Sequence, residues 1–135
     1  MRRILAVLGA VAVSSAALVQ AAPRESGEAE LAREIDGRIA GKPVNCVPLH
    51  QMRSSRIIDG TAIVYDAGTT IYVNRPRGGA RSLDRWDTLV TKTFGSSLCS
   101  SDVVQLYDAG SRMQTGVVFL GEFVPYRKPD TRPRG

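Results

Sequence analysis

The sequence predicts a mainly β protein, in which a small antiparallel sheet, arranged as a partial barrel or a sandwich, follows one short N-terminal helix. Three observations predict this class. Short segments rich in β-branched and aromatic residues recur after residue 43, and turns containing glycine separate them. Only residues 28–40 have the four-residue apolar spacing of an amphipathic helix. The chain has 135 residues, which leaves room for one domain.

The strands are expected at residues 44–47, 56–58, 61–66, 70–74, 87–94, 103–108 and 117–126. The clearest signal is the hairpin of residues 61–74, because β-branched and aromatic residues lie on both sides of a glycine turn. Ile63 and Tyr65 share one face of the first strand of this hairpin. We expect Ile71 and Val73 to meet them across the strand pair.

The helix is predicted over residues 28–40. Ser26 is a suitable N-cap, and Gly41 followed by a proline two residues later is a stop signal. The alternative is a frayed, unstructured arm, because Gly37 lies inside the helix and weakens it. The narrow apolar stripe consists of Leu31, Ile35 and Ile39.

Residues 1–21 are typical of a cleavable signal peptide. Arg2 and Arg3 follow the initiator, and residues 4–19 carry no charge; a membrane span needs about 20 apolar residues, so this run is short for one. We expect cleavage between Ala21 and Ala22. A cut after Ala22 is the second choice, and an uncleaved membrane anchor is the alternative interpretation.

The rest of the chain divides into three parts. Residues 22–41 form a leader with the amphipathic helix, residues 42–128 a single β-rich domain, and residues 129–135 a polar, disordered tail. No second apolar run of spanning length follows residue 21. We therefore expect no membrane span after signal cleavage and a periplasmic or secreted location for a bacterial protein.

Cys46 and Cys99 are expected to form a disulfide, because a lone pair of cysteines in an oxidising compartment is typical of a bridge. Closing a loop between these positions stabilises a fold by about 4 kcal/mol in the chain-entropy model. The alternative is a pair of free or metal-bound thiols. Zinc is not expected, since the sequence has one histidine and no CxxC spacing. No metal and no cofactor is predicted.

No catalytic residue is predicted. Nucleophilic catalysis needs a Ser or Cys with a base to accept its proton, and the one histidine, His50, lies in no such motif. Asp59, Asp66 and Asp108 lie beside turn glycines, where aspartate side chains bond the backbone of the turn. These carboxylates are therefore assigned to turn geometry, and not to acid–base chemistry.

A basic loop is the one candidate binding feature. Four arginines surround Gly78 and Gly79, and such a loop suits an anionic surface, a glycan or the acidic patch of an envelope protein. The alternative is a solvated loop that keeps the protein soluble. Nucleic acid is not expected as a partner, because the net charge is modest and the chain is predicted to be exported. The candidate ligand-binding residues are Arg75, Arg77, Arg81 and Arg85.

A set of ordered short motifs carries a resemblance. The segments are Gly41-Lys42-Pro43-Val44-Asn45-Cys46, Ile57-Ile58-Asp59-Gly60, Tyr72-Val73-Asn74, Leu98-Cys99-Ser100-Ser101-Asp102 and Leu120-Gly121-Glu122-Phe123-Val124-Pro125. In this order they resemble a family of small secreted bacterial proteins of unknown function. The resemblance implies a second cysteine pair in other members, at places that correspond here to Ala80 and Val118. It implies that these two residues lie close together, and it implies no activity or ligand.

Together these observations predict an exported small protein that is not an enzyme and that serves as a binding or interaction module of the envelope. The alternative is an enzyme or enzyme inhibitor whose site is not visible in the sequence. A further alternative is a structural protein whose helix at 28–40 docks on a partner.

Overall fold

The computed structural model describes residues 21–22 and 24–131. The predicted signal peptide lies outside the described residues except for Ala21, and the predicted tail is described only as far as Thr131. One helix, ten strands and two 3-10 turns make up the described chain. They are α1 Gly27–Ile35, β1 Ile39–Ala40, β2 Cys46–Pro48, η1 Leu49–Gln51, β3 Ser54–Ile58, β4 Ala62–Asp66, β5 Thr70–Asn74, η2 Ala80–Ser82, β6 Asp87–Thr91, β7 Ser97–Cys99, β8 Val103–Asp108, β9 Gln114–Phe119 and β10 Phe123–Arg127.

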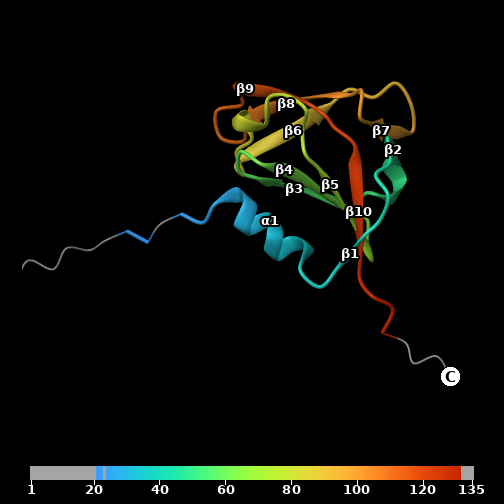
Figure 1. Ribbon diagram of the computed structural model, residues 1–135. Coiled ribbons are helices and arrows are strands. Elements are labelled where there is room, and N and C mark those ends of the chain that lie inside the picture. The colour runs from blue at the N-terminus through green and yellow to red at the C-terminus, as the bar shows by residue number, and fades with distance from the viewer. Residues whose placement is uncertain (1–20, 23, 132–135) are drawn as a thin grey trace, which may run out of the picture.

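The strands form two stacked antiparallel sheets and a two-stranded ribbon. The larger sheet has the order β1-β10-β5-β4-β3, the smaller one the order β6-β8-β9, and β2 pairs with β7. The smaller sheet lies over one face of the larger sheet, and α1 lies under the other face (Figure 1). This sandwich-like, mainly β architecture confirms the predicted fold class. No helix in the described part of the chain is long and apolar enough to cross a membrane.

The two faces of the larger sheet bury two separate apolar clusters. The first cluster fills the space between the sheets and contains Phe123, Leu106, Leu120 and Ile63, each fully buried. The second cluster lies under α1, where Leu31 is 1% exposed and packs with Ile58, Ala62, Val64, Ile71 and Val73. The helix therefore closes a face that would otherwise expose an apolar sheet surface to water.

The predicted hairpin of β4 and β5 is present, but its predicted cross-strand partners are wrong. Tyr65 lies opposite Tyr72, and Val64 lies opposite Val73. Ile63 and Tyr65 point into the first cluster, whereas Ile71 and Val73 point into the second. The turn sets the register, and a shift of one residue moves every side chain to the other face.

The predicted helix begins where expected and ends early. The Ser26 hydroxyl accepts a hydrogen bond from the amide of Ala29 at 3.2 Å, which confirms the N-cap. The helix stops at Ile35, not at Ala40, because Gly37 adopts a left-handed conformation with φ 69°. Ile39 and Ala40 then pair with β10 as strand β1. The unstructured-arm alternative is wrong, since Leu31 is buried in the sheet.

Several predicted strands differ from the structure. The strand expected at 44–47 is β2 at Cys46–Pro48, and the one expected at 56–58 begins earlier, at Ser54. The strand expected at 87–94 ends at Thr91, and Phe94 is fully exposed beyond it. The single strand expected at 117–126 is two strands, β9 and β10, which belong to different sheets. The chain crosses between the sheets at Leu120–Glu122, where an added side chain at Gly121 would lie 2.4 Å from the Arg75 carbonyl oxygen. Apolar residues lie on both sides of Gly121 and Glu122, which favours one long strand, but the close backbone approach at Gly121 breaks it.

Candidate functional site

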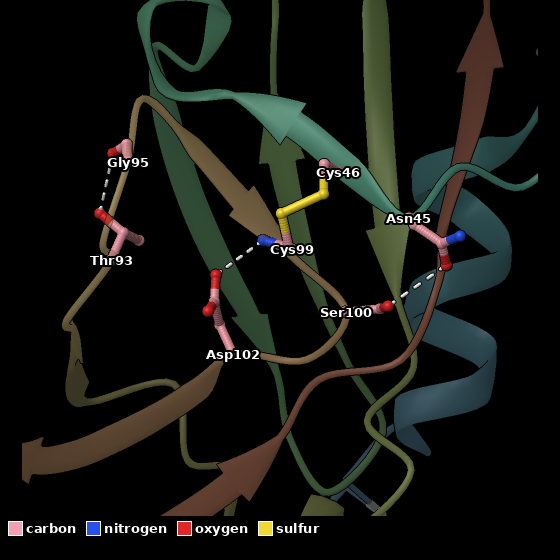
Figure 2. The surroundings of a disulfide bond; sticks show 7 residues. All are labelled: Asn45, Cys46, Thr93, Gly95, Cys99, Ser100 and Asp102. Atoms are coloured by element: carbon pink, nitrogen blue, oxygen red, sulfur yellow. Dashed lines mark hydrogen bonds between the residues drawn. A yellow bond between two sulfur atoms is a disulfide. The ribbon is translucent and has the colours of Figure 1, made fainter.

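The predicted disulfide is confirmed. Cys46 and Cys99 are bonded, and they lie directly opposite each other in the β2–β7 ribbon (Figure 2). The Asp102 carboxylate accepts a hydrogen bond from the Cys99 amide at 2.7 Å, and the Ser100 hydroxyl donates to the Asn45 side chain at 3.3 Å (Figure 2). The bridge therefore fixes the ribbon at one end of the sandwich. Strand β7 was not predicted, because Leu98 is the only buried residue of its three.

The four candidate arginines do not form one patch. Arg75 makes two hydrogen bonds to the Glu28 carboxylate, at 2.6 and 2.9 Å. Arg85 bonds the Asp59 carboxylate at 2.7 Å and the Glu30 carboxylate at 2.9 Å. The side chains of the remaining two, Arg77 and Arg81, are exposed and make no ion pair within the described chain.

Two of these arginines therefore hold α1 on the domain. A third arginine does the same from β3, because Arg56 donates to Glu34 at 2.7 Å. The hydrogen bond from Arg75 lowers the pKa of Glu28 below its usual range. The acidic side of the helix thus faces three arginines from the domain, an arrangement that the arginine spacing in the sequence did not reveal.

The turn aspartates follow the prediction at two of three positions. Asp66 accepts from the Gly68 amide at 2.7 Å, and Asp108 accepts from the Ser111 amide at 2.6 Å. The Asp59 carboxylate does not bond its own turn, where only the Asp59 carbonyl oxygen accepts a side-chain bond, from the Thr61 hydroxyl at 2.9 Å. The carboxylate accepts instead from the Arg85 amide and guanidinium, each at 2.7 Å. Burial opposes its ionisation, but the bonds and charge of Arg85 outweigh this, so the pKa of Asp59 is lowered.

A cleft opens between the edges of the two sheets, and no sequence motif pointed to it. Two hollows, of about 460 and about 250 Å³, share the lining residues Ser55 and Leu89, and the two together are called the cleft below. One wall is β3 and the other is β6. The Asp59–Arg85 contact joins these walls at the end of the cleft where β3 stops.

The walls of the cleft are edge strands, whose backbone N–H and C=O groups can form hydrogen bonds with a ligand. In the described structure β3 pairs only with β4, and β6 pairs only with β8. An edge strand presents unpaired N–H and C=O groups on its outer side. The exposed residues Ser54, Ser55 and Arg56 lie on the β3 wall. At the two ends of the cleft, Trp86 is 73% exposed and Leu49 is 40% exposed.

The floor of the cleft is apolar and contains one polar group without a partner. Met52, Leu89 and Leu98 line the smaller hollow together with Tyr65. Tyr65 is only 5% exposed, its ring packs 5.8 Å from that of Phe123, and its hydroxyl makes no hydrogen bond within the described residues. Burial raises the pKa of this phenol far above its usual value, so the hydroxyl keeps its proton. A buried donor without an acceptor is uncommon.

The remaining two features are the histidine and the side chains that could hold a metal ion. His50 lies exposed in η1 beside the cleft. Among residues 21–22 and 24–131, no group of three or more His, Cys, Asp or Glu side chains is placed to hold a metal. The cleft therefore has two properties of a binding surface: strand edges without a partner in the described chain, and an apolar floor.

No family model, curated protein or solved structure matches this chain. The resemblance to small secreted proteins accordingly stays a prediction. The resemblance implies that Ala80 and Val118 lie close together, and this implication can be compared with the structure. Ala80 packs against the first cluster, of which Val118 is a member, and a side-chain carbon added at Gly79 would lie 3.1 Å from the Val118 Cα.

Proposed function

We propose that this chain is an exported, non-catalytic interaction module of the bacterial envelope, and that the cleft between β3 and β6 is its binding surface. The observation that supports this most directly is a cleft with an apolar floor that is lined by two sheet edges without a partner in the described chain. Binding sites are typically concave and apolar, with a few polar groups that fix orientation. This cleft has that composition.

The proposed location rests on covalent chemistry. A disulfide within the chain suits an oxidising compartment such as the periplasm or the exterior. The uncharged segment at 4–19, after two arginines, is the corresponding export signal in the sequence. A periplasmic or secreted protein is the location that both features favour.

Binding of an anionic partner to the arginine loop would depend on Arg77 and Arg81. Arg75 and Arg85 are already neutralised by carboxylates of the same chain, and a new anion would have to compete with them. We therefore place the principal site in the cleft and treat the arginine loop as a secondary contact.

Site-specific photo-crosslinking in the native envelope tests the proposal. A photoreactive phenylalanine analogue at Ser55 lies on the β3 wall of the cleft. The same analogue at exposed Lys42 follows β1, at the opposite edge of the larger sheet from β3, and lines neither hollow of the cleft. We expect a discrete adduct from position 55 and none from position 42. Equal capture at both positions, or none at 55, would count against the cleft as the binding surface.

A further inference from the structure

We propose that the cleft accepts an extended segment of a partner protein, which adds to β3 as a further strand of the larger sheet. This inference rests on the function proposed above and specifies its partner. The segment carries apolar side chains on the face that meets the floor and an acidic residue near Arg53. The proposal follows from the sheet edges, the floor and the charges of the cleft, in that order.

The two stacked sheets have four edge strands, and two of these edges are protected against pairing with a further strand. The edge strand β1 has only two residues. The edge of β9 is covered, because Phe119 exchanges backbone hydrogen bonds of 2.9 and 3.0 Å with Arg77 and Gly78. Short or covered edges are the usual protection against unwanted strand pairing. The protein applies this protection on one side of the sandwich.

The other two edges are left open, and both line the cleft. Both β3 and β6 have five residues and no partner on their outer side within the described chain. Strand β3 contains no proline or bulge, and Ser54 and Ser55 leave its backbone accessible. Its one charged residue, Arg56, is held by the ion pair with Glu34 of α1. Five strand residues extend over about 17 Å, which sets the length of segment that could pair.

The floor determines the side chains of such a segment. In an extended peptide alternate side chains point to opposite faces, so every second residue would meet Met52, Leu89 and Leu98. Strand addition takes its affinity from main-chain hydrogen bonds and its specificity from pockets for alternate side chains.

The charges of the cleft favour an acidic residue at one end. Arg56 and Arg85 are neutralised by Glu34, Glu30 and Asp59. Arg53, which lines the smaller hollow, is exposed and makes no ion pair within the described chain. A carboxylate of the partner segment beside Arg53 would complete the pairing and fix the direction in which the segment lies.

The test uses the mature protein and a library of random eight-residue peptides displayed on phage. We expect selected peptides to share alternating apolar residues and one acid. A synthetic peptide is then compared with versions methylated at alternate backbone nitrogens, which lose hydrogen-bond donors and keep every side chain. Methylation on the β3-facing side should weaken binding about tenfold, as loss of a main-chain hydrogen bond predicts, whereas methylation on the other side should not.

Two further measurements locate the peptide. Hydrogen exchange should slow at the amides of residues 54–58 in the complex and stay unchanged in β9. Arg53→Glu should weaken binding by at least about fivefold, because it places like charges together. Arg127→Glu, at an exposed position of β10 that lines neither hollow of the cleft, should have no effect.

Each contrary outcome is informative. Peptides that bind without sensitivity to methylation would overturn strand addition while leaving the interaction function intact. A selection that yields no binder, together with a partner captured from position 55, would mean that the cleft recognises something other than an extended segment. Self-crosslinking at position 55 with a dimer in solution would assign the cleft to a second copy of this chain. Failure of both the selection and the crosslinking would reject the inference and the proposed function together.

Discussion

Asn74 and Gly121 are joined by two hydrogen bonds that hold the crossing between the two sheets. The Asn74 amide donates to the Gly121 carbonyl at 2.7 Å, and its oxygen accepts from the Gly121 amide at 3.0 Å. Asn74 is fully buried at the end of β5, whereas Gly121 lies between β9 and β10. One side chain thus replaces the strand pairing that the backbone loses where it changes sheets.

We expect Asn74→Ala to lower the free energy of unfolding by about 2–3 kcal/mol, because it leaves both backbone groups of Gly121 without partners. Urea denaturation under oxidising conditions measures this change. Asn45→Ala is the control, since exposed Asn45 accepts only one side-chain bond, of 3.3 Å, and its loss should change stability by less than about 0.5 kcal/mol. Equal effects of the two substitutions would contradict the assignment.

Gly121→Ala should be destabilising for a different reason. The new methyl group would lie 2.4 Å from the Arg75 carbonyl oxygen, so the backbone must move, at about 1–3 kcal/mol. Gly95→Ala is the matched control, because nothing lies within 4 Å of an added carbon there. Thermal denaturation of the two variants should separate them clearly, and a normal melting temperature for Gly121→Ala would show that the crossing is more adaptable than this contact implies.

Docking of α1 should depend on its apolar residue more than on its ion pairs. Leu31→Ala removes a side chain that is 1% exposed, and we expect a loss of about 2–4 kcal/mol. Glu34→Gln breaks a pair in which Arg56 is 56% exposed, and exposed pairs contribute less than about 1 kcal/mol. Chemical denaturation of both variants compares the two effects. A larger loss from Glu34→Gln would mean that charge, and not burial, holds the helix.

Acid should weaken the contact between Asp59 and Arg85. The pKa of Asp59 is lowered in the folded protein, so its contribution is present above the unfolded value of about 3.9 and is lost as the pH falls through the folded value. Asp59→Asn should therefore be less stable than the parent at pH 6, and the difference should vanish in strong acid. The exposed Glu122→Gln, which makes no ion pair in the described structure, should show no such pH-dependent difference.

The disulfide should contribute stability chiefly by restricting the unfolded chain. Its sequence separation of 53 corresponds to about 4 kcal/mol in the chain-entropy model. We expect reductant to lower the urea midpoint of the parent protein and to leave that of the Cys46→Ser/Cys99→Ser variant unchanged. The oxidised mass should be about 2 Da below that of the dithiol, because bridge formation removes two hydrogens. Two titratable thiols in the native protein would contradict the bridge.

The sequence by itself determined the features that depend on neighbouring residues. The β-branched segments, the helix cap at Ser26 and the turn at Asp66 follow from local conformational preference, and the disulfide follows from cysteine number and compartment. These signals extend over a few residues, so a single segment is enough to predict them.

Only the tertiary structure decided which faces and edges meet. The register that separates Val73 from Tyr65, the crossing at Gly121 and the partners of Arg75 and Arg85 join residues far apart in the chain. The cleft depends on two edge strands that remain unpaired only because the stacked sheets end there. Such relationships arise from the packing of the whole domain, and no local pattern of residues specifies them.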